Sequence, residues 1–250
     1  MINGMAQDSL LAINEEIIAC RRCPRLVEYR ERVAREKRRA FRDETYWGRP
    51  VPGFGDPNAR LLIVGLAPGA HGGNRTARIF TGDASGNFLY AALYRAGFAN
   101  QPTSVHRGDG LELSDAYIVA VIRCAPPDNK PLPEEILNCR EYLDRELEVL
   151  RDLRVIVTLG RLAFDNSLAA LARRGIPLPR PRPVFGHNLA YSLDPAGPTL
   201  IASYHPSQRN TQTGLLTPRM FDRVFAHARE LIGNPAGGND PAPGGNRRRG

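Results

Sequence analysis

Four short runs of consecutive apolar residues mark the chain, at residues 61–64, 117–122, 155–159 and 199–202. The apolar positions in these runs are continuous rather than alternating, which is typical of parallel strands that carry helices on both faces. We therefore predict that the four segments form a central, four-stranded parallel sheet.

Segments with helical periodicity separate and follow these runs. Residues 87–96 repeat apolar positions at the helical period and stop at Gly97, a residue suited to helix termination. Residues 133–150 begin with proline and two glutamates, which favour a first helical turn. Further helices are expected over residues 161–173 and 218–232. This alternation predicts a three-layer α/β/α fold with right-handed crossovers.

The two ends of the chain have a different character. Residues 9–40 are expected to form additional helices, with Ser9 as the first N-cap. From residue 233 onward the chain is rich in Gly, Pro, Asn and Arg, and too poor in apolar residues to fold. We expect one domain over residues 1–232 and a disordered tail over residues 233–250. No apolar run reaches the roughly 18 residues of a membrane span, and the first residues do not resemble a signal peptide.

Polar loops rich in Gly and Pro follow three of the four expected strands. Their sequences are GLAPGAHGGNRTARIFTGD, RCAPPDNKP and SYHPSQRNTQTG. Because the carboxyl ends of parallel strands meet at one edge of a sheet, these loops should converge there and form a site. The remaining strand enters its helix directly through Gly160, so we expect it to contribute packing.

The formal charge of +8 is concentrated in two segments. Residues 21–50 hold eleven basic and five acidic side chains, and residues 233–250 supply the rest of the excess. Of the 34 basic residues, 32 are arginine, which favours bidentate contact with phosphate. Charge alone leaves two interpretations open, a polyanionic partner or a solvated helix surface.

Four cysteines form a candidate metal-binding set. Cys20 and Cys23 are a C-x-x-C pair, whereas Cys124 and Cys139 are more widely spaced. A zinc ribbon normally offers two tight pairs, but four thiolates from distant segments fit a [4Fe–4S] cluster. The alternative is four unrelated buried cysteines that act as small apolar residues.

The loops together resemble a known family. GLAPG after the first strand, Phe80 in RIFTGD, Cys124 in CAPP and His205 in HPS resemble the uracil-DNA glycosylase superfamily, and the four cysteines match its iron–sulfur branches. The loop GLAPGAHGGNRTARIFTGD is similar to the family 5, or B-type, enzymes. The resemblance extends over about residues 15–232, and several separated motifs in the same order rarely coincide by chance.

The resemblance implies a DNA repair enzyme that flips a deaminated base out of DNA and hydrolyses its N-glycosidic bond, leaving an abasic site. It also implies a [4Fe–4S] cluster on the four cysteines, single- and double-stranded DNA as partner, and a monomer in the cytoplasm of a prokaryote, associated with the nucleoid. Two other functions stay open. One is a noncatalytic iron–sulfur DNA-binding module, and the other is a phosphate-handling enzyme, which lacks support because no G-K-[ST] signature is present.

Three residues carry the implied chemistry. Phe80 would stack on the flipped base, although packing in the core is an equal alternative. His205 would donate to the base oxygen where negative charge develops, and its alternative is a histidine bonded to nearby backbone. Asp83 would hold the attacking water, because the first motif offers only apolar side chains where better-known branches carry a polar one. Asp83 is equally suited to capping the following helix, and both roles can hold.

Other loop residues complete the implied site. Gly65, Ala67 and Gly69 are expected around the base, and His71 and Asn74 are alternatives for positioning water or the base.

The implied DNA contacts lie in two loops. Arg75 and Arg78 are expected to meet flanking phosphates, although either can instead pair with a carboxylate. The segment after the histidine motif is expected to enter the minor groove, unless it is only a polar turn; it consists of Ser207, Gln208, Arg209 and Asn210.

One position bears on substrate range. Related iron–sulfur glycosylases carry asparagine where this chain has Ala120, so a group that would read the base edge is missing. A site without matched hydrogen-bonding groups discriminates less sharply. We therefore expect hypoxanthine and other damaged bases as substrates beside uracil.

Overall fold

The computed structural model describes residues 9–233 and contains the expected parallel core. The core strands are β2 (Leu61–Gly65), β3 (Ala116–Ala120), β4 (Val155–Leu159) and β6 (Thr199–Ser203), all mutually parallel where they pair. Alternate residues of β2 enter opposite cores, with Ile63 on one face and Leu62 on the other. Because both faces are buried, the strands read as continuous apolar runs, and that prediction is confirmed.

The sheet is wider than predicted. Two antiparallel edge strands, β1 (Phe54–Gly55) and β5 (Leu189–Ser192), give a six-stranded sheet in the order β1-β3-β2-β4-β6-β5. The prediction of four strands was therefore right for the parallel core and wrong for the whole sheet. β1 has only two residues and β5 is largely exposed, so neither leaves an apolar run.

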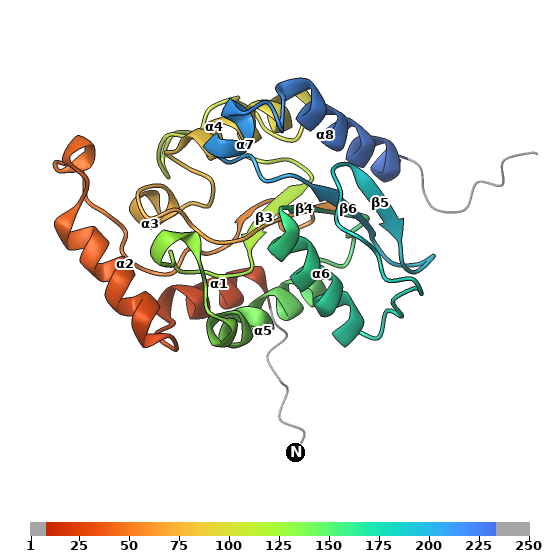
Figure 1. Cartoon of the computed structure of the whole chain (residues 1–250), viewed down its shortest axis with the longest axis horizontal. Coiled ribbons are helices and arrows are strands. Elements are labelled where there is room, and N and C mark those ends of the chain that lie inside the picture. The colour runs from red at the N-terminus through yellow and green to blue at the C-terminus, as the bar shows by residue number, and fades with distance from the viewer. Residues whose placement is uncertain (1–8, 234–250) are drawn as a thin grey trace, which may run out of the picture.

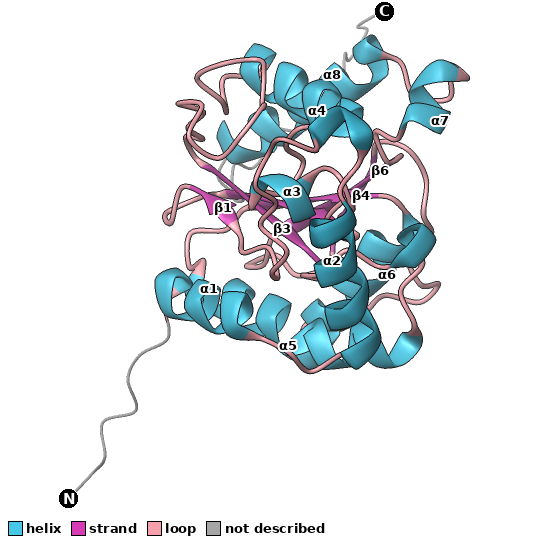
Figure 2. Cartoon of the chain, turned by 90° about the vertical axis from the view of Figure 1, so that its left-hand side faces the viewer, coloured by secondary structure: helices cyan, strands magenta, loops and turns pink. Residues whose placement is uncertain are grey.

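Helices cover both faces of the sheet and form the predicted three layers (Figure 1). On one face α4 (Ala84–Arg95) packs against α8 (Pro218–Gly233). On the other, α5 (Pro133–Val149) packs against α6 (Arg161–Arg173) and α1 (Leu10–Ala19). Helices α4 and α8 lie above the sheet in Figures 1 and 2, and α1 and α5 lie below it.

The remaining elements are short or lie beside the sheet. Helix α2 (Pro24–Glu36) runs next to α3 (Gly73–Thr76) in both views. Helix α7 (Gln208–Gln212) follows β6, and 3-10 turns occupy Arg39–Phe41 and Pro127–Asn129.

The two ends of the described chain test the predictions for Ser9 and for the start of the tail. Ser9 caps α1, since its side-chain oxygen accepts from the backbone N–H of Ala12 at 3.1 Å, and this prediction is confirmed. Gly233, placed in the tail by the sequence, is the last residue of α8. The rest of the predicted tail, residues 234–250, lies outside the described residues. Among residues 9–233, no helix is long and apolar enough to cross a membrane.

Candidate active site

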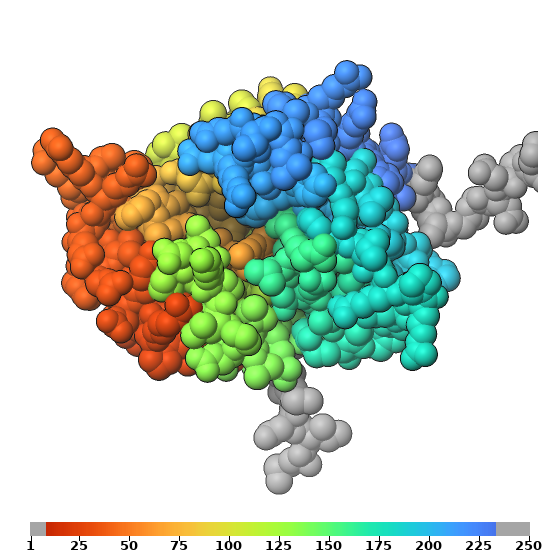
Figure 3. Space-filling view, viewed as in Figure 1, coloured from red at the N-terminus to blue at the C-terminus, as the bar shows by residue number. Residues whose placement is uncertain are grey.

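A cavity of about 820 Å³ opens where the loops after β2, β3 and β6 converge, as the sequence predicts. It is lined from within residues 66–72, 80–85, 126–129 and 205–209, with Tyr29, Arg38 and Phe41 added from the N-terminal segment. In Figure 3 the gold segment after β2 lies in a hollow between green and blue segments from later in the chain. We refer to the cavity of about 820 Å³ as the main cavity.

Phe80 is held in the wall of the main cavity by two glycines. Its ring lies against the end of β2, where a Cβ on Gly65 would come within 2.7 Å of the ring. Its backbone has a φ of 51° and rests on Gly86 in α4, so closely that no side chain would fit there. Phe80 is 7% exposed and belongs to the hydrophobic core, which confirms the core interpretation, and it also lines the cavity, where stacking on a base stays a prediction. Gly65 does not line the cavity; it makes room for the ring.

His205 lies next to Phe80 in the wall of the main cavity. The two ring centroids are 5.8 Å apart and the ring planes are inclined by 36°. Asn210 holds the backbone here by donating from Nδ2 to the carbonyl oxygen of His205 at 2.8 Å. Burial lowers the pKa of His205 to about 4, so the imidazole is neutral at pH 7. No group within residues 9–233 hydrogen-bonds to its ring nitrogens, which leaves them free for a ligand.

Gly160 explains how His205 can lie so close to the sheet. This residue ends the connection out of β4 with a φ of +99°, and a Cβ placed on it would be 3.4 Å from Cβ of His205. The short connection after the third parallel strand therefore supports the site through packing, as the sequence predicts.

Asp83 lines the main cavity and caps α4 at the same time. Its Oδ1 accepts from the backbone N–H of Gly86 at 2.8 Å. Its Oδ2 lies against Gly69 and Gly72, where a Cβ on Gly69 would be 3.2 Å away. Burial raises the pKa of Asp83, although its backbone hydrogen bonds and the charge of Arg75 oppose the shift. The helix cap is confirmed, and one carboxylate oxygen remains for chemistry.

His71 is oriented by a tyrosine that the sequence did not suggest. Its Nδ1 lies 3.0 Å from Oη of Tyr46, and that oxygen accepts from the backbone N–H of Arg38 at 3.3 Å. Burial and the charges of Arg38 and Arg75 lower the pKa of His71. A neutral His71 that accepts at Nδ1 carries its proton on Nε2. His71, Ala67 and Gly69 all line the main cavity, as expected.

Asn74 does not reach the main cavity, which corrects its assignment to the base or water. The side chain is completely buried, and its Nδ2 donates to the carbonyl oxygens of Arg30 at 3.2 Å and Ala70 at 3.4 Å. Asn74 therefore connects the loop after β2 to helix α2.

The predicted phosphate contacts of Arg75 and Arg78 are wrong, because both side chains are buried and paired within the protein. Arg75 donates to the carbonyl oxygens of His71 at 2.8 Å and Gly82 at 2.9 Å, and pairs with Glu44. These contacts hold the loop that carries His71 and Asp83 in place, and they leave the Arg75 guanidinium unavailable to a phosphate.

Arg78 makes an equally complete set of contacts. Its Nη2 donates to both oxygens of Asp109, at 2.8 and 2.7 Å, and to Oγ of Ser104 at 2.9 Å. Its Nε donates to Oγ1 of Thr81 at 2.9 Å. Arg78 therefore fixes the backbone next to Phe80, and the alternative of a carboxylate partner is the correct one.

Polar residues other than Arg75 and Arg78 lie at the rim of the main cavity. Ser207, Gln208 and Arg209 line the main cavity, and their entry into the minor groove stays a prediction. Asn210 is used in the contact with His205. Arg38 takes the place at the rim that the sequence assigned to Arg75 and Arg78. Arg38 was one of many arginines in a basic segment, and only its folded position distinguishes it.

The four cysteines are free thiols drawn from three parts of the fold. Cys20 and Cys23 lie in the turn between α1 and α2, Cys124 follows β3, and Cys139 lies on α5. The last three are buried, and burial raises the pKa of Cys124 to about 12 and of Cys139 to about 11. Within residues 9–233, no three His, Cys, Asp or Glu side chains are placed to hold a single metal ion.

Side-chain donors are directed at two of the four sulfurs. Arg30 donates from Nη1 to Sγ of Cys124 at 2.8 Å, and Asn138 donates from Nδ2 to Sγ of Cys23 at 3.5 Å. Donors of this kind suit thiolates, which are the metal-binding form of cysteine. The donor set is therefore compatible with a multi-iron cluster, whose ligands need not converge on one point.

Comparison with known proteins agrees with the fold and the cavity. Residues 52–229 match the family model for the uracil DNA glycosylase superfamily. A type-5 uracil-DNA glycosylase of Mycobacterium tuberculosis is 51% identical over 226 residues, which are 90% of this chain and 82% of that protein. The type-5 uracil-DNA glycosylase of Thermus thermophilus is 52% identical over 222 residues, which are 89% of this chain and 98% of that protein.

A more distant relative falls in a different branch. The type-4 uracil-DNA glycosylase of Sulfurisphaera tokodaii is 27% identical over 229 residues, covering 91% of this chain and 87% of that protein. The chain therefore belongs to the type-5 branch of the uracil-DNA glycosylase superfamily, which confirms the resemblance.

Proposed function

We propose that this chain removes uracil from DNA by hydrolysing its N-glycosidic bond, as an early step of base-excision repair. The observation that carries the proposal is the meeting of Phe80, His205 and Asp83 in one cavity. Its relatives that are about half identical over most of the chain are named type-5 uracil-DNA glycosylases.

The first step is extrusion of the base from the helix. A base inside duplex DNA is inaccessible, so the nucleotide must turn out of the stack into a pocket. The Phe80 ring offers a flat apolar surface for stacking, and its position is fixed by Gly65 and Gly86. Gln208 and Arg209 at the rim are placed to enter the space that the base leaves.

His205 stabilises the departing base. As the bond between the sugar C1′ and the base nitrogen breaks, its electron pair moves to the base and negative charge develops on the base oxygen. A neutral imidazole can donate an N–H to that oxygen without losing its own proton. The low pKa of His205 keeps it in this neutral form.

Asp83 directs water to the sugar. The sugar passes through a cationic, oxocarbenium-like state, and water then forms the new bond to C1′. The carboxylate accepts a hydrogen bond from this water and takes its proton, which later passes to the base or to solvent. Burial moves the pKa of Asp83 toward neutral pH, and this makes it a better base.

The proposed substrate range extends beyond uracil to hypoxanthine and other damaged bases. Ala120 is completely buried at the end of β3 and offers no hydrogen-bonding side chain to a base edge. We propose both single- and double-stranded DNA as substrates, and a monomer located with the nucleoid in the cytoplasm.

The four cysteines are proposed to hold a structural [4Fe–4S] cluster. The ligands would be Cys20, Cys23, Cys124 and Cys139, supported by the donors from Arg30 and Asn138. When bound, such a cluster would cross-link the α1–α2 turn to the sheet and to α5. The proposed chemistry at the base does not pass through it.

An oligonucleotide assay separates this function from a noncatalytic DNA-binding module. The purified chain is incubated with DNA that contains one uracil, and the products are examined for free uracil and alkali-labile sites. We expect both from uracil-containing DNA and neither from the matched thymine-containing strand. Binding of the DNA with no release of uracil would instead favour the noncatalytic module.

A further inference from the structure

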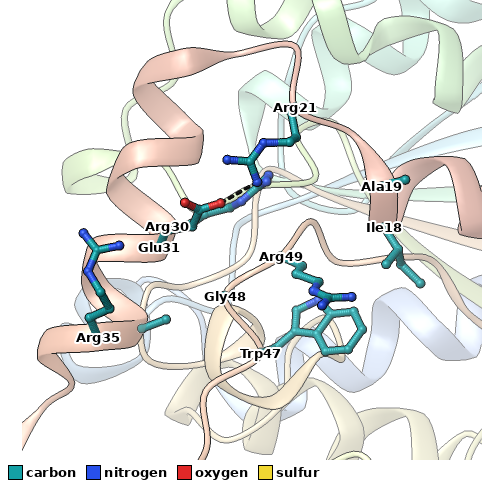
Figure 4. A pocket seen from close by; sticks show the side chains of 10 residues that line it. Ile18, Ala19, Arg21, Arg30, Glu31, Arg35, Trp47, Gly48 and Arg49 are labelled. Atoms are coloured by element: carbon teal, nitrogen blue, oxygen red, sulfur yellow. Dashed lines mark hydrogen bonds and ion pairs between the residues drawn. The ribbon is translucent and has the colours of Figure 1, made fainter.

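A second hollow, of about 590 Å³, shares no lining residue with the main cavity. Figure 4 shows the side chains that line it. Helix α2 contributes to both, because Tyr29 lines the main cavity and its neighbour Arg30 lines the hollow. The next loop does the same, since Tyr46 bonds to His71 whereas Trp47 lines the hollow. We call it the arginine hollow, after Arg21, Arg30, Arg35 and Arg49.

The charge of the arginine hollow is strongly unbalanced. Its four arginines face one carboxylate, Glu31, which pairs with Arg21 at 2.6 Å. Arg35 and Arg49 are exposed, and neither has a carboxylate at ion-pair distance within residues 9–233. Figure 4 shows the side chains of Arg35 and Glu31 on α2 and that of Arg49 on the facing loop. An excess of unpaired guanidinium groups attracts an anion.

Arg30 adds a buried positive charge to this surface. It is 2% exposed, and its Nη1 and Nη2 donate to Sγ of Cys124 and to the carbonyl oxygen of Cys20. Its Nε has no hydrogen-bond partner. Because the donors of Arg30 turn toward Cys124 and Cys20, the attraction of the hollow for an anion rests on the exposed Arg35 and Arg49.

Trp47 provides an aromatic surface among these charges. The guanidinium carbons of Arg49 and Arg107 lie 5.6 and 5.5 Å from the centre of its ring. Its Nε1 donates to the carbonyl oxygen of Pro50 at 2.9 Å, which fixes the ring orientation. Guanidinium groups interleaved with an aromatic ring are typical of surfaces that bind nucleic acid strands.

We propose that the arginine hollow binds the phosphodiester backbone of the DNA strand that flanks the excised base. The inference rests on the proposed function. Arg35 lines the hollow and Arg38, three residues later in the chain, lines the main cavity, so basic side chains of one short segment serve both sites. A strand whose damaged nucleotide occupies the main cavity would place its flanking phosphates along this segment.

The test uses the full chain with the double substitution R35Q/R49Q. Both side chains are exposed and make no ion pair, so the fold should be preserved. The matched control is R180Q/R182Q, which removes two exposed arginines from residues 176–183, away from both sites. Affinity is measured by fluorescence anisotropy over a range of salt, using labelled DNA that carries a stable abasic analogue.

DNA length separates a flanking contact from a general loss of charge. The long duplex extends about 20 base pairs, or two helical turns, on each side of the lesion. The short hairpin extends by only about half a turn. For R35Q/R49Q we expect about tenfold weaker binding of the long duplex and a salt slope smaller by about two. Binding of the short hairpin should change less than about threefold, and the control should match the wild type with both.

Trp47 supplies an independent signal, because it is the only tryptophan in the chain. The long duplex should change its fluorescence, whereas the short hairpin and millimolar inorganic phosphate should not. The proposal is overturned if R35Q/R49Q binds the long duplex like the control, or loses equal affinity for both lengths. A tryptophan response to free phosphate alone would assign the hollow to small anions instead.

Excision kinetics keep this inference distinct from the proposed function. At saturating DNA, R35Q/R49Q should release uracil at the wild-type single-turnover rate, because neither residue lines the main cavity. Absence of uracil release from the wild type would contradict the proposed function, while a length-dependent DNA contact at the hollow would still be measurable.

Discussion

The guanidinium of Arg30 donates from Nη1 to Sγ of Cys124 at a distance of 2.8 Å, in a part of the protein that excludes water. Burial raises the pKa of the Cys124 thiol to about 12, so an unliganded Cys124 is protonated at pH 7. A charged donor bonds far more strongly to a thiolate than to a thiol. The contact therefore reaches its full strength only when the sulfur is a metal ligand.

Replacing Arg30 should weaken retention of the proposed cluster. The R30M variant loses the donor to Cys124, and we expect less iron per chain and weaker visible absorption than in the wild type. The R30K variant, which keeps the charge, should lose less. R32M is a suitable control, because Arg32 is exposed on the same helix. Wild-type iron content and spectrum in R30M would contradict this role.

The pH profile of excision should identify His205 as a neutral donor. An ordinary histidine gains its proton near pH 6.5, but His205 does so near pH 4. Single-turnover rates should therefore show no loss attributable to His205 between pH 8 and 5. Any acidic limb should belong to Asp83 and should vanish in D83N. A limb near pH 6.5 that disappears in H205Q would show that His205 titrates normally.

The same shift predicts how stability depends on pH. Because the pKa of His205 is lower in the folded than in the unfolded chain, the unfolded state binds more protons between about pH 4 and 6.5. The contribution of His205 to the unfolding free energy is therefore complete above pH 6.5 and is lost as the pH falls toward 4. Urea unfolding of the wild type and H205Q at pH 7 and 5 measures it. An equal stability difference between them at both pH values would contradict the shift.

The glycine beneath the Phe80 ring is predicted to matter for activity more than for stability. In G65A the new methyl group would lie 2.7 Å from the ring, which must move into the cavity. We expect single-turnover excision to fall at least about tenfold, in line with a misplaced substrate-positioning group. Gly108 is an uncrowded exposed glycine, so G108A should behave as the wild type. Full activity in G65A would show that the ring position is not critical.

Two arginines of the site should respond in opposite ways to substitution. R78Q leaves Asp109 buried without its partner, and we expect a loss of about 3–5 kcal/mol in unfolding free energy. R38Q removes an exposed charge at the cavity rim, so it should weaken DNA binding and leave the melting temperature unchanged. Denaturant unfolding and DNA titration of both variants measure the contrast. A stable R78Q that binds DNA weakly would restore Arg78 as a phosphate contact.

Local sequence patterns predicted the features that depend on neighbouring residues. The buried strands are continuous apolar runs, and the cavity residues Phe80, Asp83 and His205 lie in loops that must meet at one sheet edge. The edge strand β5 was missed because its side chains are mostly exposed, so its sequence shows neither a run nor an alternation of buried apolar residues. For Asp83 the structure confirms the helix cap that the sequence predicts, and the residue also lines the cavity, where its role in holding water stays a prediction.

Features that depend on distant partners were not predictable in this way. Arg78 occurs in a glycine-rich loop, where composition cannot separate a phosphate contact from a pair with Asp109, 31 residues later. Asn74 likewise finds its partner on α2, 44 residues earlier. Tyr46, which orients His71, lies in residues 21–50, where the sequence showed only an excess of basic charge and nothing that pointed to a contact with His71.

Single-turnover release of uracil from one defined oligonucleotide by the wild type, D83N and H205A tests the proposed catalytic roles. We expect measurable release by the wild type, a loss of at least about a hundredfold in each variant, and unchanged DNA affinity. Circular dichroism must show that all three proteins are folded at the assay temperature. Wild-type rates in both folded variants would contradict the assignment of Asp83 and His205 as catalytic residues.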